Sequence, residues 1–178
     1  MAANYTELSP QLIQFIENQQ IFFTGTARSS GSVNVSPKGS DSLRILDPNQ
    51  LVWLNLTGSG NETAAHLLEN NRMTLMFCAF DKKPLILRLY GNAETIHPRD
   101  LKWDEYMTLF PAKTGARQLF LMTIERVQTS CGFAVPYFEY QGDRNALDVW
   151  TEKKGAEGIK TYWQEMNSRS IDGFETGI

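Results

Sequence analysis

A predicted β-hairpin near the N-terminus is the feature that most restricts how this chain can fold. Residues Phe22–Gly39 read FFTGTARSSGSVNVSPKG, in which the strand-like runs Ile21–Ala27 and Ser32–Ser36 flank the turn Arg28-Ser29-Ser30-Gly31. The second run ends in Ser36-Pro37-Lys38-Gly39. A backbone bend, a hydroxyl and an ammonium are therefore expected together at one edge of a β-sheet.

The rest of the chain supplies more strands than helices. Strand-like runs cover Leu43–Leu46, Leu51–Leu56, Met73–Phe80, Leu85–Ile96 and Leu119–Gln128. With the hairpin, these six or seven strands predict a mainly β fold, an antiparallel barrel with peripheral helices. A parallel nucleotide-binding sheet is disfavoured because strands and helices do not alternate and no G-x-G-x-x-G motif opens a helix.

Helices are expected at the periphery of this barrel. Ser9-Pro10 combines an N-cap with a proline at the first helical position of a short amphipathic helix. Further helices are predicted from Asn61 to about Asn70, over Arg99–Phe110 and over Ala156–Asn167, and an extended tail over Arg169–Ile178. Residues 1–178 are enough for one domain with a substantial core.

Composition and charge disfavour several classes of protein. The net charge of −3 and pI near 5.4 argue against nucleic-acid binding, which calls for a basic surface. No run approaches the roughly twenty apolar residues of a membrane helix, and the N-terminus lacks the pattern of a signal peptide. We therefore expect a cytoplasmic protein that does not contact a membrane.

The two cysteines and two histidines are not spaced as metal ligands. Cys78 lies in an apolar run and is expected to be a buried thiol. Cys131 has no nearby histidine to activate it, so a packing role is favoured over nucleophilic catalysis. His97, before a proline, is expected at the surface.

A second polar cluster, Gly58-Ser59-Gly60-Asn61-Glu62-Thr63, lies where a helix is predicted to begin. Unpaired backbone N–H groups at such a position favour a phosphate, and Ser59, Asn61 and Thr63 add uncharged hydrogen-bonding groups. Asn61 acting as an ordinary helix cap explains the same residues equally well.

Four motifs in order resemble one known family. The runs VNVSPKG, LVWLN, GSGNETAAHLLENNRMTLMF and LILRLYGNAE, spanning about Phe22–Val127, are similar to the pyridoxamine 5′-phosphate oxidase-like, FMN-binding split-barrel proteins. The resemblance implies a six-stranded Greek-key split barrel. It also implies a homodimer that holds two FMN molecules in grooves between subunits, with residues 129–178 as a carboxy-terminal extension at the dimer interface.

The chain departs from the oxidases proper at several motif positions. Val33 stands where their strand begins with an arginine, Asn61-Glu62-Thr63 replaces their serine-arginine-lysine phosphate clamp, and Leu85-Ile86 replaces an arginine-glutamine pair. The residues that grip pyridoxal phosphate are not recognisable. The resemblance therefore implies the fold and a flavin rather than vitamin B6 chemistry.

Eight residues are the candidates for cofactor binding. Lys38 is expected near the flavin phosphate or pyrimidine edge, Val35 and Ser36 along the ring, and Asn55 near the ribityl chain. Each also has an ordinary reading, as a solvated lysine or turn residue. Arg88, in an apolar strand, needs an anionic ligand or a structural ion pair. The full set is Val35, Ser36, Lys38, Asn55, Ser59, Asn61, Thr63 and Arg88.

Two functions from different classes remain open at this level. The first is an FMN-dependent oxidoreductase that uses a small-molecule electron donor or acceptor, with no identifiable acid–base catalyst. The alternative is a non-catalytic module that binds flavin, deazaflavin or haem, the last with His66 as the candidate axial ligand. A barrel without cofactor is a third reading. The aromatic residues Phe133, Tyr137, Phe138 and Trp150 are expected to cover a neighbour's flavin or to form a dimer interface.

Overall fold

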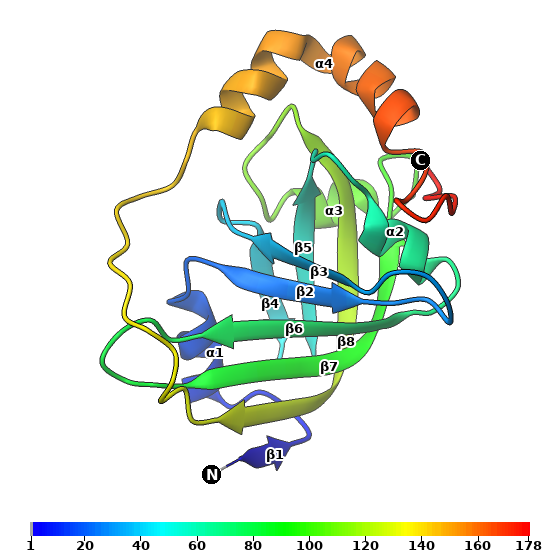
Figure 1. Cartoon of the computed structure of the whole chain (residues 1–178). Coiled ribbons are helices and arrows are strands. Elements are labelled where there is room, and N and C mark those ends of the chain that lie inside the picture. The colour runs from blue at the N-terminus through cyan, green and yellow to red at the C-terminus, as the bar shows by residue number, and fades with distance from the viewer. Residues whose placement is uncertain (1) are drawn as a thin grey trace.

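The computed structural model describes residues 2–178, in which one antiparallel sheet curls around an apolar core and helices lie at its margins (Figure 1). The strands are β1 (Ala3–Tyr5), β2 (Phe22–Thr26), β3 (Asn34–Lys38), β4 (Leu43–Asp47), β5 (Gln50–Leu56), β6 (Arg72–Cys78), β7 (Ile86–Ile96) and β8 (Ala116–Ser130). The helices are α1 (Pro10–Glu17), α2 (Glu62–Leu67), α3 (Trp103–Met107) and α4 (Ala146–Met166).

The sheet has the strand order β3-β2-β6-β7-β8-β5-β4, with β1 pairing to β8. The predicted mainly β antiparallel fold is confirmed, but a closed six-stranded barrel is wrong. There are eight strands within residues 2–178, and the end strands β3 and β4 do not pair with each other. All seven runs identified from the residues form strands. The eighth, β1, has three residues, too few to show the alternation that identifies a strand.

Strand β8 holds the two halves of the sheet together. Its residues Leu119–Ser130 pair with β7, and Ala116–Thr123 pair with β5 on the opposite edge. The 15 residues of β8 form hydrogen bonds with β5 in the first part of the strand and with β7 in the later part. The side chains at its two ends therefore take fixed positions relative to β5 and β7.

The main core fills the inside of the curled sheet. Trp53 stacks on Phe120 with ring centroids 4.5 Å apart, and Phe22 stacks on Phe77 at 5.7 Å. A second cluster, on the other face of β5 and β8, packs against α3 and includes Val52, Leu54 and Leu119. Since β5 is buried on both faces, its sequence is a continuous apolar run rather than an alternating one.

Helix α1 begins as predicted. The Ser9 hydroxyl accepts a hydrogen bond from the Leu12 amide, and Pro10 occupies the first turn. Cys78 is buried, as expected, but Cys131 is exposed and His97 is buried, so the packing role of Cys131 and the surface position of His97 are both wrong. The exposure of Cys131 follows from its place just beyond β8, where the chain leaves the sheet.

The other helices differ from their predicted ranges. Helix α2 has six residues, α3 has five, and α4 begins ten residues earlier than predicted. Gly155 interrupts α4 with φ 68° and ψ 168°, a backbone conformation that glycine adopts without a steric penalty. The sequence periodicity identified only the half after this break. The tail is not simply extended, because Arg169 bridges to Glu175 across a turn.

Between β8 and α4, the chain from 131 to 145 runs along the outside of the sheet without regular structure, and α4 then crosses above it (Figure 1).

No helix within residues 2–178 combines the length and the apolar character needed to cross a membrane.

Gly91 lies at the irregularity that the sequence suggested. The register of β7 against β8 shifts between Tyr90 and Gly91, and a Cβ on Gly91 would collide with the backbone carbonyl oxygen of Thr123. We expect Gly91→Ala to lower the free energy of unfolding by about 2–3 kcal/mol, because backbone rather than a flexible side chain must move. Chemical denaturation measures this loss.

Gly25 in β2 is the matched control. A Cβ there would meet Thr74 O at an ordinary 3.8 Å, so Gly25→Ala is expected to change stability by less than about 1 kcal/mol. Equal losses in the two variants would contradict the close approach at Gly91.

Candidate functional site

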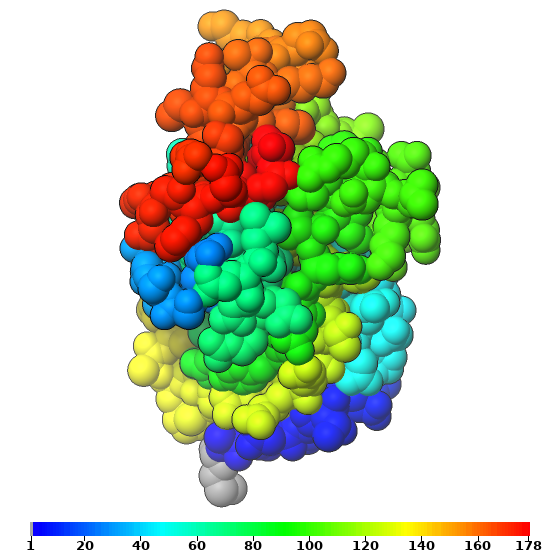
Figure 2. Space-filling model, turned by 90° about the vertical axis from the view of Figure 1, so that its right-hand side faces the viewer, coloured from blue at the N-terminus to red at the C-terminus, as the bar shows by residue number. Residues whose placement is uncertain are grey.

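A cavity of about 720 Å³ opens at one edge of the sheet. Its walls are edge strand β3, the end of β5 with the loop after it, the start of β8, and the C-terminal tail. Figure 2 shows the red tail packed between α4 above it and the blue and teal segments of the β2–β3 turn and α2. Seven of the eight candidate residues line this cavity, namely Val35, Ser36, Lys38, Asn55, Ser59, Asn61 and Thr63.

Lys38 ends β3 and directs its ammonium over an aromatic ring. Its Nζ lies 5.4 Å from the centroid of the buried Trp53 ring, within cation–π range. Burial lowers the pKa of Lys38 to about 8, and the positive charge of Arg117 contributes to the same shift. The ammonium is therefore held in a partly apolar environment beside a second cation.

Arg117, which the sequence analysis missed, is that second cation. It lies on β8, its side chain is 3% exposed, and Nη1 donates a 2.6 Å hydrogen bond to Asn167 Oδ1. Its Nε is buried without a hydrogen-bond partner, and burial lowers the pKa of Arg117 to about 10. An arginine within the apolar strand ARQLFLMTI was the signal that could have identified it, since an isolated buried charge is costly.

Neither of these two cations, the partly buried Lys38 and the buried Arg117, has a carboxylate partner. Among residues 2–178, the ion pairs involve other lysines and arginines, and no acidic oxygen lies within 4.0 Å of Lys38 or Arg117. Glu62, the carboxylate that lines the cavity, accepts a hydrogen bond from the Ile171 amide at 3.0 Å. The cavity thus holds uncompensated positive charge, which favours an anionic ligand.

The polar loop before α2 is built differently from its prediction. Asn61 does not cap the helix; its Nδ2 instead donates to Asn167 O at 3.4 Å, and its Oδ1 is buried without a partner. Thr63 Oγ1 accepts from Asn34 Nδ2 at 3.2 Å, which ties the loop to β3. Because α2 has only six residues, the positive charge at this wall comes mainly from Arg117.

The other candidates on the sheet have partners of their own. Ser36 Oγ lies 3.0 Å from the Thr24 hydroxyl, and Asn55 Nδ2 donates to Gln118 Oε1 at 3.1 Å. Gln118 Nε2 is buried without a partner. Val35 is 66% exposed.

Arg88 is the candidate that does not line the cavity. It lies on β7, where Nη1 donates to Ser130 Oγ at 3.2 Å. Residues 2–178 contain no carboxylate in an ion pair with Arg88, so a hydroxyl takes the place of the structural ion pair that we considered.

The C-terminal tail supplies a wall that the sequence did not predict. Met166, Arg169, Ser170 and Ile171 line the cavity, and Arg169 pairs with Glu175 at 2.5 Å. Asp172 fastens the tail to the β2–β3 turn, since its carboxylate accepts from the Ser32 amide at 2.7 Å and the Ser32 hydroxyl at 3.0 Å. Ser32 and Asp172 are 140 residues apart, so the sequence could not predict these contacts.

The side chains do not support a haem site with His66 as its axial ligand or a site for a metal ion. His66 is buried, its Nδ1 lies 3.0 Å from Thr26 Oγ1, and it does not line the cavity. Residues 2–178 contain no cluster of three or more histidine, cysteine or acidic side chains suited to a metal ion.

Comparison with known proteins identifies the family and agrees with the fold. A family model described as pyridoxamine 5′-phosphate oxidase matches residues 8–131. The chain belongs to the pyridoxamine 5′-phosphate oxidase family. The pyridoxamine 5′-phosphate oxidase family protein ustO of Aspergillus flavus is 36% identical over 187 aligned residues, covering 95% of this chain and 75% of the relative. The family match ends before the tail that closes the cavity.

Solved structures share the fold at lower identity. A candidate pyridoxamine 5′-phosphate oxidase of Lactobacillus delbrueckii aligns with TM-score 0.57 and 20% identity over 71% of this chain and 97% of its own. HupZ of Group A Streptococcus aligns with TM-score 0.53 and 19% identity over 67% and 91% of the two chains. These likenesses concern the sheet and not the ligand.

The pKa of Lys38 predicts a specific dependence of stability on pH. This pKa falls from the ordinary 10.5 to about 8 in the folded chain. Between about pH 8 and 10.5 the unfolded chain therefore binds more protons, so stability rises with pH across this window. We expect ligand-free Lys38→Met to melt at a higher temperature than the wild type at pH 7, with the difference shrinking towards pH 10. Circular dichroism melts follow the change.

Lys83→Met, in an exposed loop, is the control for replacing a lysine by methionine. A difference between Lys38→Met and the wild type that stays constant from pH 7 to 10 would show that Lys38 is not strained by burial.

Proposed function

We propose that this protein binds FMN in the cavity beside β3 and serves as a flavin-dependent oxidoreductase for a small-molecule substrate. The observation that carries the proposal is a pair of cations, the partly buried Lys38 and the buried Arg117, without carboxylate partners in a cavity of about 720 Å³. A volume of this size lies within the range of small-ligand pockets. Family membership supports a flavin as the anionic ligand.

The side chains present fit a phosphorylated, ring-bearing ligand. Arg117 has an unpaired Nε, so it has a hydrogen-bond donor left for a ligand. We assign the phosphate to Arg117 and the loop of Ser59, Asn61 and Thr63, and the ring to Val35, Ser36 and Lys38. Asn55, at the end of β5, contributes from the wall between them.

Bound FMN would supply hydride and electron transfer, while the protein supplies position and charge. The ammonium of Lys38, held over Trp53, presents a positive charge to the ligand in a partly apolar setting. The motif departures at Val33 and Leu85-Ile86 argue against vitamin B6 as the substrate. A cytoplasmic location remains a prediction from the sequence.

One observation favours a second candidate, a module that binds flavin or deazaflavin without turnover. No histidine, cysteine or tyrosine among residues 2–178 lines the cavity, and its carboxylate, Glu62, already accepts a hydrogen bond. Anaerobic addition of NADH or NADPH separates the two candidates. Bleaching of the flavin band indicates an oxidoreductase, whereas an unchanged band with either donor favours the binding module.

Flavin binding itself is tested by absorption and by one charge substitution. The purified protein, or the protein incubated with FMN and desalted, is expected to absorb near about 370 and 450 nm. Arg117→Met should lower the FMN affinity at least about tenfold, since it removes a charged donor. It should still fold, because a buried unpaired charge is replaced by an apolar side chain of similar length.

Arg88→Met is the matched control, because Arg88 lies outside the cavity and should leave FMN binding unchanged. A colourless wild type after incubation with FMN would reject the proposal, and an intense Soret band would indicate haem instead. Full retention of FMN by Arg117→Met would reject the assignment of the phosphate.

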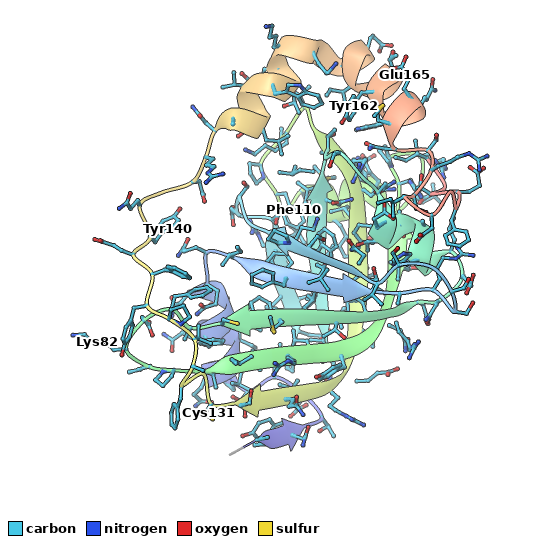
Figure 3. All side chains as sticks on the ribbon, in the orientation of Figure 1. Lys82, Phe110, Cys131, Tyr140, Tyr162 and Glu165 are labelled. Carbon is cyan, nitrogen blue, oxygen red and sulfur yellow. The ribbon has the colours of Figure 1, made fainter. Side chains whose placement is uncertain are left out.

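We also propose that the protein is a homodimer and that its interface includes the segment from 131 to 145. This segment carries Phe133, Tyr137, Phe138 and Tyr140, which are 82%, 77%, 67% and 54% exposed. Figure 3 shows Tyr140 on this irregular segment at the outside of the molecule, whereas Phe110 lies in the body of the molecule. Aromatic side chains clustered on an extended segment are typical of protein interfaces, and such a patch is unfavourable in water.

The dimer is tested by replacing two of these aromatics. Phe133→Ser with Tyr137→Ser is expected to convert a dimer into a monomer in size-exclusion chromatography with light scattering. Leu101→Ser, at a still more exposed site before α3, is the control and should leave the mass unchanged. A monomeric wild type at micromolar concentration would reject the homodimer.

A further inference from the structure

Asn167, at the end of α4, joins three walls of the cavity. Its Oδ1 accepts from Arg117 Nη1 at 2.6 Å, and its Nδ2 donates to Gly58 O at 3.1 Å. Its backbone carbonyl accepts from Thr176 Oγ1 at 2.6 Å and from Asn61 Nδ2 at 3.4 Å. One fully buried residue thus connects β8, the polar loop and the tail.

The chemistry of this contact matters as much as its geometry. The amide of Asn167 orients the guanidinium of Arg117 through a hydrogen bond but carries no charge of its own. A carboxylate in its place would form an ion pair and neutralise Arg117. The guanidinium is therefore held in one orientation, and its positive charge remains available for a ligand.

The unused donor of Arg117 shows that the arrangement is not simply a packed core. Arg117 lines the cavity and is 3% exposed. Its Nε has no hydrogen-bond partner within residues 2–178. A buried cation without a counter-charge is costly unless a ligand supplies one.

We infer that Asn167 is a positioning residue, which orients Arg117 towards the phosphate subsite that the proposed function assigns to Arg117 and the loop at Gly58–Asn61. This inference rests on the proposed function, in which the phosphate is that of FMN. Asn167 lies outside residues 8–131, which match the family model, so the tail of this chain completes the subsite.

Comparing FMN with riboflavin tests this inference, because the two ligands differ only in the phosphate. Binding is measured by quenching of flavin fluorescence in the wild type, in Asn167→Asp and in Thr176→Val. The Asp variant keeps the acceptor for Arg117 and adds a neutralising charge, and it also removes the donor to Gly58 O. The Val variant removes the tail's bond to the Asn167 carbonyl without changing any charge.

We expect the wild type to prefer FMN over riboflavin and Asn167→Asp to reduce that preference at least about tenfold, the scale of one charged hydrogen bond. Thr176→Val should change both affinities together and keep the preference within about twofold. An unchanged preference in Asn167→Asp, or an equal loss of preference in Thr176→Val, would overturn the inference.

A second measurement, the melting temperature with and without inorganic phosphate, does not need a flavin. Phosphate is expected to raise the melting temperature of the wild type and not that of Asn167→Asp. If the wild type binds no flavin but shows this difference, the proposed function fails and the subsite stands. If phosphate stabilises neither protein, the subsite is rejected whatever the flavin result.

Discussion

The antiparallel pairing of β8 with both β5 and β7 is the constraint on which the rest of the structure depends. It places Phe120 against Trp53 in the core. Three residues earlier the register of β8 against β5 shifts, so that Arg117 has no partner residue on β5 and lines the cavity. Successive residues of a regular strand face opposite sides, and this irregularity interrupts the alternation at Arg117, so the register of β8 against β5 decides where the charge lies. Burial of Arg117 is thus a consequence of the sheet and not a local accident.

The electrostatic state of the cavity follows from that placement. Lys38 on β3 and Arg117 on β8 come from strands that are not neighbours in the sheet, yet they are close enough for Arg117 to lower the pKa of Lys38. Two like charges in a partly apolar site raise the free energy of the ligand-free protein. An anionic ligand offsets this cost, which gives a physical reason for binding that is independent of any likeness to other proteins.

The sequence predicted the sheet better than the site. Strand β5 is recognisable because both of its faces are apolar, and β2 with β3 because a polar turn separates them. Lys38 was identifiable from its position after a strand and a proline. Arg117 and Asn167 were not paired in advance, since 50 residues separate them and nothing local in either neighbourhood signals the contact. Contacts of that kind depend on how α4 and the tail return to the sheet, which periodicity does not encode.

The division of the cavity between two parts of the chain bears on specificity. Lys38, Asn55 and Thr63 lie within residues 8–131, where the family model matches, whereas Arg169 and Ile171 come from the tail beyond it. The tail is held by polar contacts at Asp172 and Asn167, so its position is fixed by a few hydrogen bonds rather than by a large apolar surface. Exchanging such a segment alters one wall of the cavity without disturbing the core of the sheet. Relatives that share this sheet can therefore differ at this wall of the cavity while keeping the strands that form the others.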